Sequence, residues 1–237
     1  MKGRISFFGA CCKMCITRIR RNSSLQLQQT YLHRTDPMTI FKTLVVCASL
    51  LLAACSNPAL DALPENATIL AFGDSLTAGK GTSPDLSYPA VLAQLSGRDV
   101  INAGVSGETT AEGLQRLPEV LDLAGPRLLL LMHGGNDILR NLGATQAKAN
   151  LASMINLARE RDIQVVLIGV PEKKLLSSSA PYYKELADEF DLVLEKSIIS
   201  KLIKRPALKS DSVHFNAQGY REIANTVYEL LQKHGAL

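Results

Sequence analysis

The sequence predicts an α/β protein built on a parallel sheet with helices on both faces. Short runs of apolar residues recur along the chain, and each run is followed by a segment of helix length. Such runs are typical of strands buried on both faces, and their alternation with helices is the pattern of an α/β fold. The runs are Thr68 to Phe72, Val100 to Ala103, Leu128 to Met132 and Val165 to Val170, with a weaker fifth at Leu192 to Leu194.

Segments between and after these runs carry the spacing of amphipathic helices, with apolar residues three and four apart. We expect two such stripes to face the core and assign them no functional role. They are Ala147, Leu151, Met154, Ile155 and Ala158, and then Tyr220, Ile223, Ala224, Val227, Leu230 and Leu231. Pro171 to Tyr183 has no regular pattern and is expected to be a loop. Because ligands bind outside the carboxyl ends of strands in open α/β sheets, the functional residues are expected in the loops that follow the runs.

Charge and cysteine are unevenly placed along the 237 residues. The formal net charge is +4, yet residues 1–55 hold 8 Lys and Arg against one acidic residue, whereas residues 56–237 hold 18 basic and 21 acidic residues. All 5 cysteines also precede residue 56. The body of the protein therefore has no basic footprint for nucleic acid. It also has neither a disulfide framework nor a thiolate metal site.

The N-terminal segment predicts export. Residues 38–55 read as a signal peptide, with Lys42 in a short n-region and an apolar run too short to cross a bilayer. Its ending, Leu-Ala-Ala-Cys, resembles a bacterial lipobox, which predicts lipid attachment at Cys55, a tether over 56–67 and a protein anchored on the periplasmic side of a bacterial membrane. An ordinary secretory signal cut near the same place, or an uncleaved anchor, remains open. Residues 1–37 precede a complete signal with its own Met, so we interpret them as an upstream extension or a misassigned start.

The stretch "ILAFGDSLTAGKGTS", after the first run, permits two kinds of chemistry. A phosphate loop requires G-x-x-x-x-G-K-[ST], but Gly73 lies one residue too far before Gly79, and Lys80 is followed by Gly81 rather than by a hydroxyl. The dinucleotide-binding pattern fails as well, since Ser75 occupies the place of its second glycine. A nucleophilic serine is the alternative, although Thr77 breaks the G-x-S-x-G elbow of the α/β-hydrolases.

A serine nucleophile needs a base, and the body offers His133, His214 and His234. His234 lies in the last few residues, where fraying is expected. His214 follows Asp211 by three residues, so the carboxylate can accept a hydrogen bond from Nδ1 and leave Nε2 free for Ser75. His133 could act in a rival arrangement with Asp137 as the nearest carboxylate, but a structural or substrate-contacting role is favoured for it.

Four separated blocks resemble, in order and spacing, those of the SGNH or GDSL hydrolases, and the closest match is to the branch of the bacterial periplasmic thioesterase/lysophospholipase and the arylesterases. The blocks are "GDSLTAG" (73–79), "NAGVSGETT" (102–110), "GGND" (134–137) and "DSVH" (211–214). The resemblance covers about 68–237. It implies a flavodoxin-like, three-layer α/β/α sandwich with about five strands. It also implies a triad of Ser75, Asp211 and His214, and an oxyanion hole formed by Ser75, Gly107 and Asn136.

The residue types suit these roles on chemical grounds. Gly107 precedes a helical segment that starts near Thr109, so its N–H is free and no Cβ blocks the substrate. The Asn136 amide can donate to developing negative charge without titrating. Gly104 competes with Gly107 but is expected to serve only the turn after the second run. Asp74 and Asp137 are interpreted as hydrogen-bonding partners that brace the loops.

Two residues depart from the family pattern. Phe215 stands where the family usually has Pro after the catalytic histidine, which could place the ring differently or alter the acyl pocket. His133 adds a titratable group where relatives are commonly apolar. Both residues affect the prediction of the substrate more than the prediction of the reaction, because neither replaces a member of the triad.

The sequence thus predicts a serine ester hydrolase that cleaves carboxylic esters or thioesters, with lysophospholipids as one candidate substrate and without a metal or organic cofactor. Removal of O-acetyl groups from surface polysaccharide or peptidoglycan is the second interpretation. A membrane-tethered binding lipoprotein with vestigial hydrolase residues is the third. No interaction with nucleic acid is expected.

Overall fold

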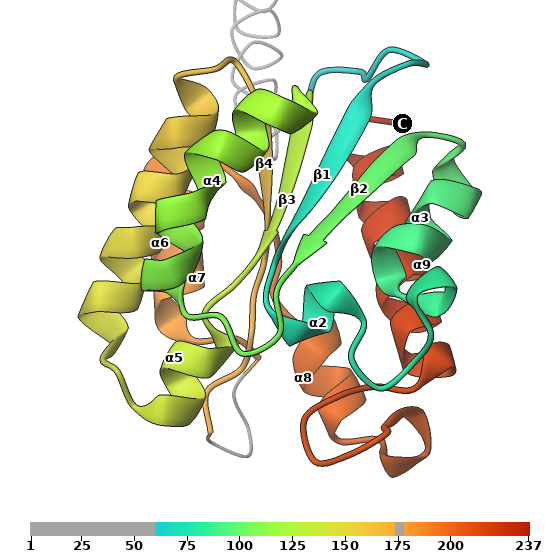
Figure 1. The fold of residues 1–237 in the computed structure, drawn as a ribbon, viewed down its shortest axis with the longest axis vertical. Helices are drawn as coiled ribbons and strands as arrows, with labels where there is room; N and C mark the ends of the chain where they lie inside the picture. Colours follow the sequence, from blue (N-terminus) through green and yellow to red (C-terminus); the bar gives the residue numbers. More distant parts are fainter. Residues whose placement is uncertain (1–59, 174–177) are drawn as a thin grey trace, which may run out of the picture. The chain divides into compact units, whose positions relative to one another are not determined.

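The computed structural model describes residues 60–173 and 178–237. Within these ranges, five parallel strands form one sheet in the order β2-β1-β3-β4-β5. The strands are β1 (Thr68–Gly73), β2 (Asp99–Gly104), β3 (Leu128–Met132), β4 (Gln164–Ile168) and β5 (Val193–Glu195). Figure 1 shows β1 and β3 in the middle of the sheet, and every residue of β3 is buried. The apolar runs therefore predicted all five strands.

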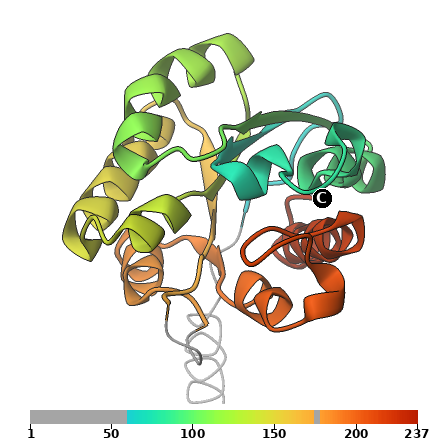
Figure 2. The same cartoon turned by 60° about the horizontal axis from the view of Figure 1, so that its bottom comes forward.

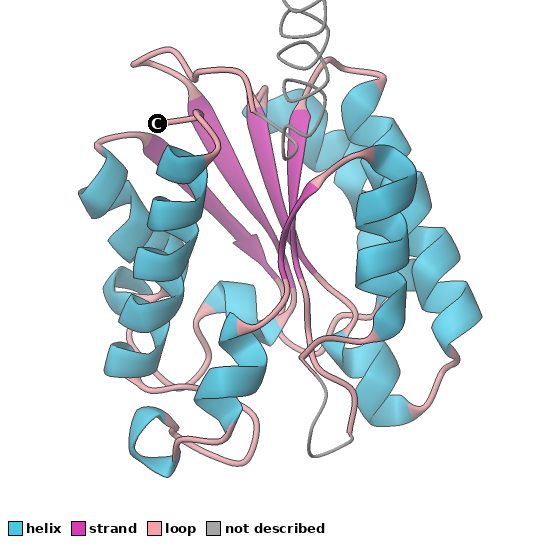
Figure 3. Ribbon diagram, turned by 180° about the vertical axis from the view of Figure 1, so that it is seen from behind, coloured by secondary structure: helices cyan, strands magenta, loops and turns pink. Residues whose placement is uncertain are grey.

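Helices cover both faces of the sheet, which confirms the predicted three-layer α/β/α sandwich (Figures 1 and 3). One face carries α3 (Tyr88–Ser96) and α9 (Ala217–Lys233), with α8 (Ile198–Ile203) beside α9. The other carries α4 (Thr110–Ala124), α6 (Ala144–Arg159) and α7 (Pro181–Phe190), with the short α5 (Gly135–Arg140) next to α6. The predicted stripes on α6 and α9 are buried, except for the half-buried Leu230.

The remaining elements lie at the edge where the strands end. They are the one-turn helix α2 (Ser75–Ala78) and two short 3₁₀ turns, η1 (Pro84–Leu86) and η2 (Pro206–Leu208). Figure 2 turns this edge toward the viewer. The direction of chain connection reverses between β1 and β3, because β2 lies on one side of β1 and all later strands lie on the other. Ligands of open α/β sheets bind at such a switch point.

The expected loop over Pro171 to Tyr183 ends earlier than predicted. Helix α7 begins at Pro181, whose fixed φ suits the first helical position. Tyr182 and Tyr183 are buried, and the Tyr183 hydroxyl donates to the carbonyl of His133 at 2.6 Å. The prediction was wrong here because two tyrosines next to a proline resemble a loop until their burial is known.

Both ends of the described domain are held in place. The Leu60 N–H donates to the His234 carbonyl and the Leu63 N–H to the Ala236 carbonyl, each at 2.9 Å. Leu63 and Ala67 are buried. Residues 60–67, the described part of the predicted tether, are thus attached to the domain at Leu60, Leu63 and Ala67. The expectation that His234 lies in a frayed end was also wrong.

Several predictions concern parts of the chain outside the described residues: the extension over 1–37, the signal peptide over 38–55 and the lipid attachment site Cys55. Within the described residues, none of the helices combines the length and the apolar character that crossing a bilayer requires.

Candidate active site

Ser75 stands immediately after β1, on the first residue of α2. The Asp74 carboxylate caps this helix by accepting the Leu76 N–H at 3.0 Å, and Gly79 ends it at φ +84°. The tight exit from β1 requires Gly73, because a Cβ there would lie 2.0 Å from the carbonyl oxygen of Met132. This turn leaves Ser75 with 8% of its surface exposed at the carboxyl edge of the sheet.

His214 reaches Ser75 from the loop before α9, 139 residues further along the chain. Its Nε2 lies 2.9 Å from the Ser75 Oγ, and its Nδ1 lies 2.7 Å from an oxygen of Asp211. An ionised carboxylate only accepts, so Nδ1 carries the proton and Nε2 is the acceptor for the serine hydroxyl. The predicted trio is thus a continuous hydrogen-bonded chain in the geometry of a nucleophile, a base and its orienting acid.

Asp211 is fixed by its own loop. It accepts the backbone N–H of His214 at 2.8 Å and that of Val213 at 2.7 Å, in addition to the imidazole. The backbone bond from His214, followed by its imidazole bond and the Val213 bond, lowers the pKa of Asp211 well below its ordinary value. The carboxylate therefore stays ionised at neutral pH, although its side chain is half exposed.

Phe215, the departure from the family pattern, does not displace His214. Its ring is fully buried and meets the Tyr220 ring edge-on, with 5.8 Å between centroids. Residues Lys209 and Phe215 form an antiparallel bridge, and the Ser210 N–H donates to the His214 carbonyl at 3.0 Å. The Asn216 side chain caps α9 by accepting the Gly219 N–H at 3.1 Å. The apolar ring thus anchors the loop that holds the imidazole.

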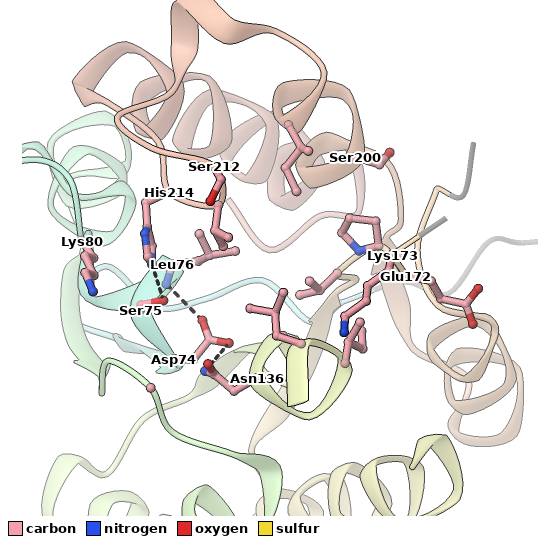
Figure 4. Close-up of a pocket in the computed structure, with 18 of the residues that line it drawn as sticks. Asp74, Ser75, Leu76, Lys80, Asn136, Glu172, Lys173, Ser200, Ser212 and His214 are labelled. Carbon is pink, nitrogen blue, oxygen red and sulfur yellow. Dashed lines mark hydrogen bonds between the residues drawn. The ribbon is translucent and has the colours of Figure 1, made fainter. Parts of the chain in front are cut away.

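Gly107 and Asn136 line the same cavity as Ser75. Gly107 adopts φ +84°, and its carbonyl accepts Nη2 of Arg140 at 2.7 Å. The Asn136 Nδ2 donates to the Glu108 carbonyl at 2.9 Å and lies 3.5 Å from Asp74 (Figure 4). In the described part of the chain, the N–H groups of Ser75 and Gly107 donate to no other residue. These donors are therefore free to bind an anionic oxygen.

The competing glycine and the two bracing carboxylates have structural surroundings. A Cβ on Gly104 would lie 2.1 Å from the Ala78 N, so Gly104 allows β2 and α2 to touch. Asp137 accepts both the N–H and the hydroxyl of Thr110, at 2.9 and 2.6 Å, and so ties α5 to α4. Burial raises the pKa of Asp74 above its ordinary value. These contacts agree with the bracing role predicted for both carboxylates.

His133 is not placed to act as a rival base. It is fully buried and does not line the cavity. Its Nε2 lies 3.0 Å from the Glu108 carboxylate, and its Nδ1 accepts the Gly134 N–H at 3.0 Å. The predicted partner, Asp137, was the nearest carboxylate in sequence. Glu108 is 25 residues away and approaches only because β2 and β3 end at the same edge, so sequence spacing gave no signal for it.

A cavity of about 670 Å³ opens beside Ser75 and His214 (Figure 4). Its wall is mainly apolar. The apolar residues come from α2, α5 and α8, from the segment after β4 and from the His214 loop: Leu76, Ile138, Leu139, Val170, Pro171, Ile203 and Val213. Three lysines also line it: Lys80, Lys173 and Lys204. In the described ranges, no group of three His, Cys, Asp or Glu side chains could hold a metal ion.

Hydrogen bonds join a serine, a histidine and an aspartate at the switch point of a parallel sheet, and free N–H donors lie beside them. This arrangement is that of the α/β serine hydrolases. The chain belongs to the GDSL-like lipase/acylhydrolase family, whose model matches residues 71–222. The resemblance seen in the four sequence blocks is confirmed, and the protein is a serine esterase of this family.

Relatives and solved structures support this assignment over most of the domain. The chain is 33% identical over 197 residues to an arylesterase of Vibrio mimicus, covering 78% of this chain and 97% of that one. It is 31% identical over 173 residues to the thioesterase 1/protease 1/lysophospholipase L1 of Escherichia coli strain K12, covering 70% and 83%. Among solved structures, TesA superposes with a TM-score of 0.65 at 27% identity, over 70% of this chain and 99% of that one. AlinE4, an SGNH-hydrolase family esterase, superposes with a TM-score of 0.57 at 36% sequence identity, over 73% of this chain and 98% of that one.

Proposed function

We propose that the protein hydrolyses carboxylic esters and thioesters of apolar acyl chains through an acyl-enzyme on Ser75. The observation that carries this proposal is the hydrogen-bonded chain from Asp211 through His214 to the Ser75 Oγ, which ends in an apolar cavity. In the first step the Oγ attacks the acyl carbonyl carbon while Nε2 of His214 takes its proton. The electron pair of the broken C=O π bond moves onto the carbonyl oxygen.

Three donors would stabilise the resulting oxyanion: the N–H of Ser75, the N–H of Gly107 and Nδ2 of Asn136. Collapse of this intermediate expels the alcohol or thiol, which takes the proton from Nε2. Water then attacks the acyl-enzyme as Nε2 accepts its proton, a second oxyanion forms at the same donors, and its collapse releases the acid and returns the proton to Oγ. Atoms and charge balance without any cofactor.

The cavity favours acyl chains longer than acetyl. Contacts with its apolar wall are lost to an acetyl group but available to a butyryl or octanoyl chain, and burial of each CH₂ group contributes about 0.8 kcal/mol. The three lysines complement a negative charge on the leaving group, as in a lysophospholipid or an acyl thioester with phosphates. Because of the apolar wall we rank acyl ester hydrolysis above deacetylation of glycans.

An ester panel tests this proposal. The full chain, purified in detergent, should hydrolyse p-nitrophenyl butyrate and octanoate faster than the acetate and should release p-nitrophenol in a burst equal to the enzyme concentration. A lysophospholipid and an acyl thioester are assayed in parallel. The Ser75→Ala variant should lose the burst and nearly all turnover. Retention of the wild-type rate by this variant would refute the assignment, and acetate release from acetylated glycan alone would favour the second interpretation.

We also propose that the protein is exported and lipid-anchored through Cys55, on the basis of the apolar run and the Leu-Ala-Ala-Cys ending of residues 38–55. Metabolic labelling with an alkyne analogue of palmitate should mark the wild-type protein in the membrane fraction of a bacterial host and leave Cys55→Ser unlabelled. Equal labelling of both proteins would exclude Cys55 as the acceptor.

A further inference from the structure

A buried charged cluster lies behind the proposed oxyanion donors. The Glu108 carboxylate binds Arg116 twice, with Nε at 2.5 Å and Nη2 at 2.7 Å, and also lies 3.0 Å from Nε2 of His133. The side chains of Glu108 and His133 are 6% and 0% exposed, and that of Arg116 is 25% exposed. Arg116 in addition donates to the carbonyl of Ala103 at 2.8 Å. The cluster thus joins the ends of β2 and β3 to helix α4.

Geometry fixes the protonation pattern of this cluster. The Gly134 N–H donates to Nδ1 of His133, so this nitrogen is an acceptor and the ring proton sits on Nε2, which donates to Glu108. Burial alone would raise the pKa of Glu108, but the hydrogen bonds from His133 and Arg116 outweigh it and lower the pKa below its ordinary value. The Glu108 carboxylate therefore lies between the two donors, the Arg116 guanidinium and the His133 Nε2–H.

Two of the three proposed oxyanion donors depend on the peptide units around Glu108. The Glu108 carbonyl accepts a hydrogen bond from the Asn136 amide at 2.9 Å, and Asp74 Oδ2 lies 3.5 Å from the same nitrogen. The closer bond, to Glu108, restricts the orientation of the amide beside the cavity that Asn136 lines. The Gly107 N–H belongs to the preceding residue. His133 connects the same carboxylate to the Gly134 N–H, two residues before Asn136. A movement of Glu108 would therefore shift both donors together.

Helix α4 is shaped to accommodate the cluster. Its second turn contains Gly113, where a Cβ would lie 2.5 Å from Nε2 of His133 and 3.2 Å from the Glu108 carboxylate. Glycine is a poor residue for the interior of a helix, so its presence there is explained by the close approach of this pair. Buried ion pairs add little stability compared with apolar residues of the same volume, so stability alone is a weak reason for the cluster.

We propose that Glu108, held by Arg116 and His133, is a positioning residue that aligns the Gly107 N–H and the Asn136 amide for the oxyanion. This inference rests on the proposed function of Ser75 and its donors. It concerns alignment in the transition state, since Glu108 itself does not line the cavity. Loss of the carboxylate should therefore lower kcat and leave KM nearly unchanged.

The test compares kinetics with the binding of a transition-state analogue. Glu108→Gln retains the size of the side chain, and Arg116→Met removes its partner at a site exposed enough for the variant to fold. For each full-length variant, kcat and KM are measured with p-nitrophenyl butyrate, and Ki is measured for butylboronic acid, which forms a tetrahedral adduct with a nucleophilic serine. We expect kcat to fall 10- to 100-fold, KM to change less than threefold, and Ki to rise by the same factor as kcat falls.

A double-mutant cycle and a stability control separate alignment from a merely structural role. In an Asn136→Ala background the further loss from Glu108→Gln should be smaller than in the wild-type background, because one of the two aligned donors is already absent. Leu121→Ala, a core change on the same helix, should lower the unfolding temperature and leave kcat unchanged.

Three results would each overturn the proposal. The first is that kcat and Ki of both variants stay within twofold of wild type. The second is that Glu108→Gln lowers kcat by the same factor in the Asn136→Ala background as in wild type, and the third is that Leu121→Ala lowers kcat as much as Glu108→Gln does. Failure of the proposed function itself would appear differently, as wild-type turnover that survives Ser75→Ala.

Discussion

Replacement of Asp211 by asparagine should move the ring proton of His214 from Nδ1 to Nε2 and leave the backbone of the loop almost unchanged. The carboxylate accepts the Nδ1–H at 2.7 Å and two backbone N–H groups through its other oxygen. An asparagine oxygen can keep the two backbone bonds, which places its NH₂ group opposite Nδ1. A donor there makes Nδ1 the acceptor, so the ring proton moves to Nε2 and points at Ser75.

The magnitude follows from this loss of the base. In serine hydrolases of the same geometry, such a change of tautomer lowers kcat by about 10⁴-fold. The Asp211 side chain here is 49% exposed, so water can restore part of the correct tautomer. We therefore expect a fall of about 10³-fold in kcat/KM, equivalent to about 4 kcal/mol of transition-state stabilisation.

The assay is hydrolysis of p-nitrophenyl butyrate between pH 6 and 9 by wild type, Asp211→Asn and a matched control. Asp122→Asn serves as the control, since Asp122 is an exposed carboxylate on α4 that binds Arg161 at 2.8 Å and does not line the cavity. The control should keep the wild-type rate. A rate for Asp211→Asn within tenfold of wild type at any pH in this range would refute the reasoning from the tautomer.

Four further outcomes are expected. Asn136→Ala should lower kcat by about 10²- to 10³-fold with little change in KM, as measured with the butyrate ester; a fall of less than fivefold would exclude this amide as an oxyanion donor. Gly73→Ala should fail to give a cooperative unfolding transition by circular dichroism, because its Cβ would overlap the carbonyl of Met132. Ile203→Trp should reduce turnover of the octanoate at least tenfold and spare the acetate, unless the acyl chain lies elsewhere. Because the pKa of Glu108 is lowered in the folded protein, its contribution to stability should be present above about pH 4.3 and be lost as pH falls through the folded value; urea unfolding of Glu108→Gln should therefore depend less on pH between 3 and 5.

The strands were predictable because a strand that is buried on both faces consists of a continuous run of apolar residues. Each of the five apolar runs became a strand, and the stripes on α6 and α9 face the core. The contact between Asp211 and His214 was equally accessible, since the two residues lie three apart in one turn. Contacts of this kind, between residues close in sequence, can be predicted from the spacing of the residues.

Other features depended on contacts between distant segments. The packing of Leu63 beside the C-terminus and the start of α7 at Pro181 have no local signature. The partner of His133 was misassigned for the same reason, because Asp137 is near in sequence but turns toward Thr110, whereas Glu108 arrives from the end of β2.

The sequence by itself therefore predicted the class of fold, the reaction class and the five candidate site residues. Only the tertiary structure showed that the His214 Nε2 lies 2.9 Å from the Ser75 Oγ and that the Asn136 amide donates to the Glu108 carbonyl at 2.9 Å. The physical reason is that parallel strands bring the ends of distant segments to one edge of the sheet, where distances of a few ångströms depend on how helices and loops pack rather than on the order of the residues.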